Sequence, residues 1–511
     1  MITYPKRLIE VDLPIKRISA HARREKSIRL GHISTLHIWW ARRPLAACRA
    51  TICAALWPDP ADQHCPEVFR QVAKSHMLSW AMNHLGLLSK ESFSRFVAIQ
   101  QSPNLLDDDL MLRHALLDFI ADFAKWDNST TKEYLNTSRI LTQSAHEGLY
   151  GTRDTPFLVV DPFAGGGAFP IEAARLGVAS FAGDYNILSW SINRLQLELL
   201  PKCKGTLGDL NKFWGERFLN ESKKRLSNYY PSDSDGKQVV GYLWARTIKC
   251  EGPACGVDVP ILKTTHLTSK GGIGKWIEIS YDKDVLITKI TSTKPRVLGT
   301  SKRSSVTCPK CGYTTPQARV AIQAINYGFA YHLYAIGVRA AGGNTTIYRE
   351  PIDKDRVPLA AAHLRLLEYE KIDANNNTGA IPCEELPYLR SIFNVRVYGI
   401  DKWRGLFTER QLVSALELVD LFKEFVIRIT SDIEDSNVRQ ALILSLGLSL
   451  SNALQYQCNI ATWLSESIKS AFIQGQSLPM KMDFVEANPL YDGLAGGLAY
   501  SFSKHRSGIQ Y

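Results

Sequence analysis

Two sets of residues in this chain of 511 amino acids have types and spacings that could do chemistry. The first set is two close cysteine pairs, Cys250 with Cys255 and Cys308 with Cys311, and a glycine follows each pair. Thiolates on two short turns can reach one tetrahedral Zn²⁺, and four sulfur ligands leave no open coordination position. We therefore expect a structural zinc ion here. The alternative is two redox-active or incidental cysteine pairs.

The second set is a glycine loop that follows an apolar run. Residues 156–161 read PFLVVD, which predicts a strand ending at Asp161, and the chain continues through Pro162, Phe163, Gly165, Gly166 and Gly167. Glycines let the backbone pass close to a ligand, and the N-terminus of the next helix offers free N–H groups. Asp184 ends the next apolar run, at a spacing where an acid typically bonds ribose hydroxyls. The alternative is an ordinary glycine-rich turn.

The elements around this loop predict a βαβ unit with parallel strands over residues 156–184. Apolar positions spaced near 3.6 residues predict helices over 20–56 and 67–147. Short strands are expected over 239–330, and a mainly helical region from 391 to about 476. We expect an α/β fold in six regions: a basic N-terminal segment (1–60), a helical region (61–150), a cofactor-binding half (151–238), a zinc-ribbon insertion (239–330), a mixed then helical region (331–480) and a tail (481–511).

The charge of the chain is unevenly distributed. The formal net charge is +11, yet residues 1–50 hold eleven Lys/Arg against three Asp/Glu, and residues 262–303 hold nine against three. Clustered cations favour a polyanion, because neutralising phosphates releases condensed counterions. Two such runs beside recognisable motifs indicate nucleic acid. The alternative is a solvated basic surface.

Composition limits the class of protein. Hydrophobic residues make up 45% and charged residues 22% of the chain, as in ordinary globular proteins. No uncharged apolar run reaches the roughly 18 residues of a membrane span. Ten cysteines are too sparse for a disulfide scaffold, and the six outside the two pairs are expected to be buried thiols. We expect a cytoplasmic protein that does not bind a membrane.

Two segments resemble motifs of DNA amino-methyltransferases. The run DPFAGGG, residues 161–167, is similar to their S-adenosylmethionine-binding motif, Asp-Pro-Phe-x-Gly-x-Gly. The run HIWWARRPL, residues 37–45, resembles a Lys-Pro-x-x-Leu type segment that contacts the methionine part of the cofactor, which implies such a role for Arg43 and Pro44. The alternative for this second run is that its tryptophans are core and its arginines are surface.

Further segments extend the resemblance over essentially the whole chain. They are similar to elements of adenine-specific DNA methylases that contain a zinc ribbon and an N-terminal domain of unknown function: LIEVDLPI (8–15), YLWARTIKC (242–250), VYGIDKW (397–403), LFTERQL (406–412) and LPMKMDFVEANP (478–489). The resemblance implies a Rossmann-type methyltransferase fold, S-adenosylmethionine as methyl donor and N6 of adenine in DNA as acceptor, in restriction-modification or phage defence. It places Gly165, Gly166 and Gly167 around the cofactor, Asp161 near its methionine part and Asp184 on its ribose.

The sequence departs from this family at the catalytic motif. Adenine amino-methyltransferases carry Asp/Asn-Pro-Pro-Tyr/Phe, which orients the target amine and stacks on the extruded base. None of the 23 prolines here is adjacent to another. Asn488-Pro489-Leu490-Tyr491 is the nearest match, but it follows a family element that comes before the motif. No catalytic residue is assigned.

We therefore expect a truncated enzyme or one half of a split enzyme, with a second chain supplying the motif. An alternative is a non-catalytic nucleic-acid-binding subunit with a vestigial methyltransferase fold. A methyltransferase acting on RNA or a small molecule would share the cofactor loop and differ only in its acceptor.

Overall fold

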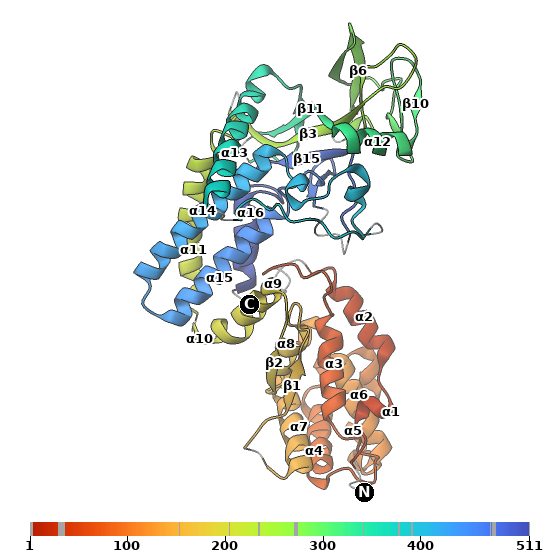
Figure 1. Cartoon of the computed structure of the whole chain (residues 1–511). Helices are drawn as coiled ribbons and strands as arrows, with labels where there is room; N and C mark the ends of the chain where they lie inside the picture. The colour runs from red at the N-terminus through yellow and green to blue at the C-terminus, as the bar shows by residue number, and fades with distance from the viewer. Residues whose placement is uncertain are drawn as a thin grey trace. The chain divides into compact units, whose positions relative to one another are not determined.

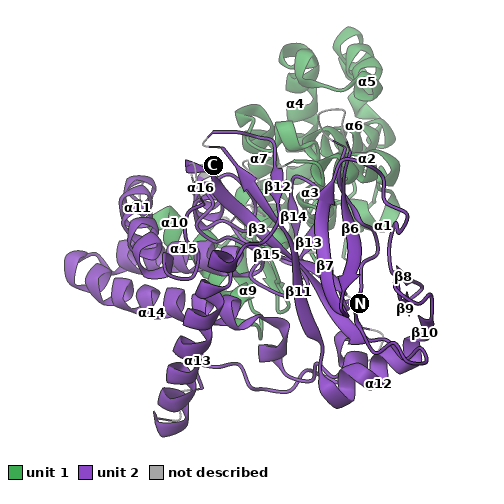
Figure 2. Ribbon diagram, turned by 90° about the horizontal axis from the view of Figure 1, so that it is seen from above, with its two compact units in different colours: residues 1–35, 41–204, 511 green, residues 36–40, 205–510 purple. Residues whose placement is uncertain are grey.

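The computed structural model of the chain describes residues 4–28, 36–152, 154–203, 205–233, 236–269, 274–340, 342–376, 379–389, 392–470, 472 and 477–509. The chain divides into two compact units, coloured separately in Figure 2. Unit 1 comprises residues 1–35, 41–204 and 511, and unit 2 comprises residues 36–40 and 205–510. None of the helices in the described ranges combines the length and apolar character needed to cross a bilayer.

The first part of unit 1 is helical. Its elements are α1 (Leu8–Val11), α2 (Ile15–Glu25), α3 (Leu45–Leu56), α4 (Glu67–Asn83), η2 (Leu85–Leu87), α5 (Lys90–Gln101), η3 (Pro103–Asp107), α6 (Asp109–Phe123), η4 (Trp126–Asn128) and α7 (Lys132–Tyr150). The helical prediction over 67–147 is confirmed. That over 20–56 holds for α2 and α3, and residues 29–35 lie outside the described ranges. Buried Trp57 and Trp80 donate their indole N–H groups to Thr142 and Thr137 of α7, which anchors the core to that helix.

A βαβ unit follows the helices, as the sequence predicts. It consists of β1 (Leu158–Asp161), α8 (Ala168–Arg175) and β2 (Ala179–Ala182), and the two strands pair in parallel with Leu158 opposite Ala179. The chain continues into α9 (Ile187–Asn193), a π-helical segment η5 (Arg194–Leu199) and α10 (Leu200–Lys202). The parallel strands bring the chain after Asp161 and the chain after Ala182 to the same edge of the sheet.

Unit 2 is built on an antiparallel sheet with the strand order β12-β11-β3-β15, and β4 also pairs with β3. These strands are β3 (Gln238–Lys249), β4 (Asp258–Pro260), β11 (Ala330–Arg339), β12 (Ile347–Arg349) and β15 (Asp483–Ala487). The ten inner residues of β3 are all buried, so this strand is the centre of the unit. Glu486 of β15 and Arg410 form a fully buried ion pair with N···O of 2.7 Å.

Helices and short elements complete unit 2. The main helices are α11 (Leu207–Leu226), α13 (Val357–Asn376), α14 (Glu409–Asp432), α15 (Ser436–Leu454) and α16 (Leu498–Ile509). Figure 1 shows α11, α14, α15 and α16 as one bundle. The short elements are η7 (Asp353–Asp355), η8 (Asn394–Tyr398), η9 (Trp403–Leu406), β13 (Thr462–Trp463) and β14 (Ile468–Lys469). The helical prediction from 391 to about 476 thus holds as far as Leu454.

Two buried histidines tie residues 36–40 to this bundle. His505 donates from Nδ1 to the Leu36 carbonyl at 2.7 Å, and its Nε2 lies 2.9 Å from Ser445 Oγ. Burial lowers the pKa of His505 to about 4, so its imidazole is neutral. His37 Nε2 lies 3.2 Å from Ser451 Oγ on α15. The segment before Ala41 therefore belongs structurally to unit 2.

Small strands surround the four cysteines of the predicted zinc ribbon. They are β5 (His266–Thr268), β6 (Lys275–Asp282), β7 (Val285–Thr291), β8 (Ser301–Lys302), β9 (Ser305–Thr307) and β10 (Thr314–Thr315), followed by α12 (Gln317–Tyr327). They form two three-stranded antiparallel sheets, β5-β6-β7 and β10-β9-β8. We call residues 250–327 the metal module. Figure 1 shows β6, β10 and α12 at one end of β3 and β11.

Candidate functional site

The glycine loop of unit 1 joins β1 to α8 and is fastened to the chain that leaves β2. Ala164 N–H donates to the Gly183 carbonyl, and Gly183 N–H donates to the Asp161 carbonyl, both at 2.9 Å. Gly165 and Gly167 have φ of +52° and +78°, a left-handed conformation that a side chain would disfavour. The backbone of the loop therefore requires glycine at two of the three predicted positions.

Asp184 lies directly on this loop. Its Oδ2 accepts the Gly165 N–H, and its Oδ1 accepts the Asn186 N–H, both at 2.8 Å. Partial burial raises the pKa of Asp184, but these hydrogen bonds lower it more, so the pKa lies below its usual value. The carboxylate is charged at neutral pH, and each oxygen keeps a further lone pair for a hydroxyl donor.

Two residues of α9 that sequence reasoning missed hold the other side of the loop. Ser189 Oγ and Asn193 Nδ2 donate to the Gly165 carbonyl at 2.6 and 3.0 Å. Asn193 Oδ1 is buried and has no hydrogen-bond partner in the described structure. Ser189 and Asn193 are four residues apart on one face of a helix that follows the second strand. That spacing is the signal that could have found them.

The exposed part of the loop is formed by its first residues. Phe163 is 85% exposed, and its N–H donates to Asp161 Oδ1 at 3.2 Å. Pro162 is exposed, whereas Asp161 and Gly166 are half-buried. The loop can thus offer a ligand main-chain N–H groups, two carboxylates and an aromatic ring.

The start of α3 lies against the start of α8, which places Pro44 near the glycine loop within unit 1. Leu45 and Cys48 form a small hydrophobic cluster with Ala168, the first residue of α8. Glu25 caps α3 by accepting the N–H groups of Leu45 and Ala46 at 2.8 and 2.9 Å. These two donors are therefore already satisfied, and any contact with a ligand falls to side chains of this segment.

The predicted tryptophan-arginine segment is divided between the two units. Trp39 and Trp40 belong to unit 2, whereas Arg42 and Arg43 belong to unit 1. Trp40 is 40% exposed, Trp39 is half-buried and both arginines are exposed. The interpretation of the tryptophans as core is therefore wrong. Arg43 has no side-chain hydrogen bond or ion pair within the described ranges.

A buried ion pair fixes α8 to α3. Arg49 Nε lies 2.7 Å from Glu172 Oε2, and both residues are fully buried. The guanidinium also donates to the Phe123 carbonyl at 2.5 Å and packs 5.0 Å from the Phe123 ring. This pair holds the helix that carries the C-terminal end of the glycine loop.

The second candidate site is the cysteine cluster of the metal module. Cys250, Cys255, Cys308 and Cys311 bring their sulfur atoms within 4.8 Å of one another. The sulfurs of Cys250 and Cys311 are 3.5 Å apart, and those of Cys255 and Cys308 are 3.9 Å apart. Four sulfurs at about 2.3 Å from one tetrahedral Zn²⁺ would lie about 3.8 Å apart. The four cysteines could hold a metal ion, and their geometry is consistent with structural zinc.

The two turns present these thiols as metal sites usually do. Gly256 and Gly312 have φ of +65° and +78°, so each turn reverses directly after its second cysteine. The Tyr313 N–H lowers the pKa of Cys311 to about 7, whereas burial raises the pKa of Cys250. A bound cation would favour the thiolate form of every ligand.

The other six cysteines divide between buried and exposed positions. The expectation of buried thiols is confirmed for Cys48, Cys53, Cys65, Cys203 and Cys458. It is wrong for Cys383, which is exposed because it lies in an irregular segment rather than in a core helix. Burial raises the pKa of Cys48 to about 12, which keeps that thiol protonated beside the glycine loop.

Asn488, the nearest match to a catalytic asparagine, is engaged inside the fold of unit 2. Its Nδ2 donates to the Val239 carbonyl at 2.8 Å, and its Oδ1 accepts the Leu490 N–H at 2.9 Å. Asn488 and Tyr491 are both buried. Neither side chain is presented to a base in this conformation.

Comparison with known proteins gives one match. Residues 12–78, which span α2, α3 and most of α4, match a family described as protein of unknown function, DUF1156. No curated protein matches the chain, and no solved structure matches it. The match agrees with the expected N-terminal domain of unknown function, and it includes Arg43 and Pro44 but neither the glycine loop nor the cysteines.

Proposed function

We propose that this chain is the cofactor-binding part of an S-adenosylmethionine-dependent methyltransferase that acts on N6 of adenine in DNA. The observation that carries the proposal is the hydrogen bond between Asp184 and the Gly165 N–H. This bond joins a glycine loop and an acid that follow two adjacent parallel strands. Ligands of open α/β folds bind at the carboxyl ends of such strands, so we assign the βαβ unit to a Rossmann-type core.

Two features of the loop fit a ligand that carries hydrogen-bond donors. A Cβ on Gly167 would come within 2.3 Å of Asn193 Oδ1, so no side chain can fill this position. The same Oδ1 is a buried acceptor without a partner in the described structure. S-adenosylmethionine carries an ammonium group and two ribose hydroxyls, which are donors of the required kind.

The chain's own residues divide the binding work. Asp184 accepts the ribose hydroxyls, and Asp161 faces the ammonium of the methionine part with Arg43 and Pro44 nearby. Gly165, Gly166 and Gly167 let the backbone approach closely, and Pro162 and Phe163 form the outer wall. When bound, S-adenosylmethionine supplies an electrophilic methyl group on a sulfonium. The cysteine cluster holds structural Zn²⁺ and takes no part in the transfer.

The proposal assigns the base-binding motif to another polypeptide. The printed sequence has no Pro-Pro dipeptide, and both polar groups of the Asn488 side chain are bonded to backbone. The same observation favours one second candidate, a non-catalytic nucleic-acid-binding subunit in which the methyltransferase fold is vestigial.

Calorimetric titration of the zinc-loaded chain with S-adenosylmethionine separates these two functions. We expect binding by the native chain, a loss of at least tenfold in Asp161→Ala, and no change in Asp154→Asn. Asp154 is an exposed residue before β1, so this control removes a comparable charge away from the loop. Absence of binding by the folded native chain contradicts the methyltransferase proposal and leaves the nucleic-acid-binding subunit.

A further inference from the structure

The metal module contains cations that no acid of the fold neutralises. No Asp or Glu occurs between Asp284 and Glu350 in the sequence. Some cations of this stretch pair with acids elsewhere, as Lys310 does with Asp284 and Arg319 with Glu251. Others have no ion pair and no side-chain hydrogen bond among the described residues, namely Lys289, Lys294, Arg296, Lys302 and Arg303. We call these five, together with Lys263, the basic strip.

Backbone hydrogen bonds bring Lys263 beside the middle of the strip. Thr265 N–H donates to the Leu298 carbonyl at 3.0 Å, and Thr300 N–H donates to the Leu262 carbonyl at 2.9 Å. A Cβ on Gly299 would meet the Lys263 carbonyl at 2.6 Å, so the two segments are in direct contact. All six side chains of the basic strip are exposed.

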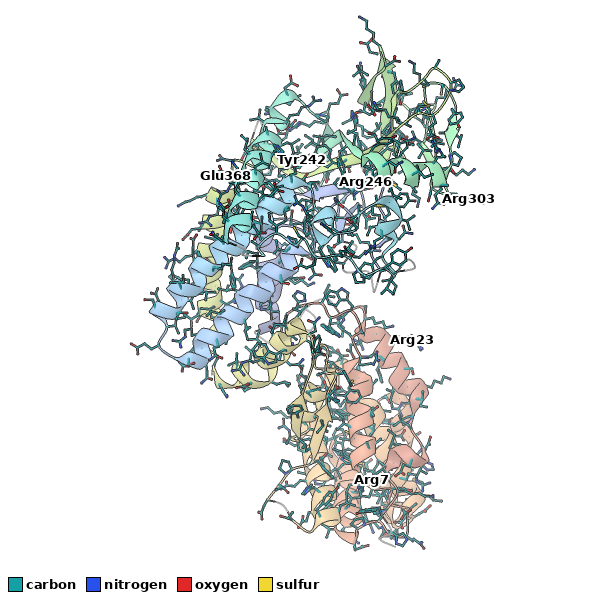
Figure 3. The ribbon with its side chains drawn as sticks, in the orientation of Figure 1. Arg7, Arg23, Tyr242, Arg246, Arg303 and Glu368 are labelled. Atoms are coloured by element: carbon teal, nitrogen blue, oxygen red, sulfur yellow. The ribbon has the colours of Figure 1, made fainter. Side chains whose placement is uncertain are left out.

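The turn at the end of the strip carries a cation where the backbone favours glycine or asparagine. Arg303 and Ser304 connect β8 to β9 in a two-residue turn, with φ of +49° and +65°. Asn-Gly would form such a turn without the steric cost that a longer side chain brings. Arg303 is thus placed against the preference of the turn, which points to a use outside the fold. Figure 3 labels Arg303 on the metal module.

Cations near the N-terminus have a different fate. Arg17 contacts Asp118 and Asp122 at 2.7 and 2.6 Å, and Arg49 is buried against Glu172. These arginines stabilise unit 1. Arg23, labelled in Figure 3, is exposed like Lys16 and Lys26. These three have no ion pair in the described ranges, so they provide a matched set of charges.

We propose that the basic strip binds the phosphate backbone of double-stranded DNA. The choice of DNA rests on the proposed function, whereas the anionic polymer follows from the strip itself. Exposed cations without protein partners gain most from phosphates, because each contact releases condensed counterions. The zinc-held turns directly after β9 fix the strip, so DNA binding depends on the metal but not on S-adenosylmethionine.

Fluorescence anisotropy with a 30-base-pair duplex tests this assignment on the zinc-loaded full chain between about 50 and 200 mM salt. We expect Lys294→Ser/Arg296→Ser/Arg303→Ser to weaken binding at least tenfold. The slope of log K against log salt should fall by about three, because each phosphate contact contributes roughly 0.9. The control Lys16→Ser/Arg23→Ser/Lys26→Ser removes the same charge and should change affinity less than twofold.

Four outcomes overturn the proposal. They are no binding of DNA by the native chain, equal losses in the two triple variants, tighter binding to an RNA duplex of the same sequence, and tighter binding to vesicles rich in phosphatidylserine. Zinc content and circular dichroism confirm that each variant is folded. Calorimetry with S-adenosylmethionine on the same samples separates this result from failure of the proposed function, because strip variants should bind the cofactor normally.

Discussion

The glycine loop of unit 1 and the cysteine cluster of unit 2 both depend on left-handed glycines, but different forces hold them. Hydrogen bonds from Asp184, Ser189 and Asn193 close the glycine loop. The cysteine cluster gathers four sulfurs within 4.8 Å, where thiolates repel one another unless a cation lies between them. The loop is therefore preformed without a ligand, whereas the cluster needs a metal to keep its shape.

Removal of the metal should produce the largest effect and should be confined to one region. Structural zinc sites contribute roughly 10–16 kcal/mol to folding. A chelator, or Cys308→Ser, should abolish hydrogen-exchange protection in β8, β9 and β10 and leave β1 and β2 protected, as measured by mass spectrometry. Cys383→Ser is the control, because this exposed cysteine is outside the cluster. Unchanged protection of the metal module after chelation would contradict the comparison.

Breaking the ion pair behind the glycine loop should be the next largest effect. Arg49→Met leaves Glu172 buried without its partner, which costs about 3–5 kcal/mol in the free energy of unfolding measured with urea. Arg24→Met removes a pair whose side chains are 58% and 46% exposed, and it should cost less than about 1 kcal/mol. The double variant Arg49→Met/Glu172→Met should recover part of the loss. Equal costs for the two single variants would rule out a buried clamp.

A side chain at Gly167 should disturb the loop by a smaller amount. Gly167→Ala adds a Cβ 2.3 Å from Asn193 Oδ1 at a φ of +78°, so we expect a loss of about 1–3 kcal/mol. Gly151→Ala is matched, because Gly151 has a φ of +72° and open space around its Cβ. It should cost only the backbone part, about 1 kcal/mol. Thermal unfolding of both variants measures the difference, and identical losses would mean that the loop is not closely packed at Asn193.

The Asp184 carboxylate should give the smallest effect, and one that depends on pH. Folding lowers the pKa of Asp184 below its ordinary value of 3.8. Its contribution is therefore fully present above pH 4 and is lost as the pH falls through the folded-state pKa. Asp184→Asn should cost about 1 kcal/mol at pH 6, and this difference should shrink toward pH 3 in urea unfolding. A difference that stays constant between pH 3 and pH 6 would show that the charge of the carboxylate is not used.

The sequence could predict what local patterns encode. The apolar runs and glycines around Asp161 determine a βαβ unit by themselves, and the cysteine spacing determines the cluster. The residues that hold the loop could not be predicted in this way, because Arg49 and Glu172 are 123 positions apart. No pattern in the run of residues 37–45 shows that it changes units after Trp40. That break depends on His505, which is 469 positions from Leu36.

The charge patterns show the same limit. Two basic runs are equivalent in the sequence, yet Arg17 and Arg49 are used inside unit 1, whereas Arg296 and Arg303 have no acidic partner in the described ranges. Only the tertiary positions of the acids separate structural cations from those available to a ligand.

Hydrogen-exchange mass spectrometry of the zinc-loaded chain, with and without S-adenosylmethionine, tests the central claim most directly. We predict that the cofactor slows exchange in the backbone amides of residues 161–168 and 184–193 and leaves the metal module unchanged. Asp161→Ala should remove this protection, and Asp154→Asn should retain it. Exchange that is unaltered by saturating cofactor, or protection located only elsewhere in the chain, would contradict the assignment of the glycine loop.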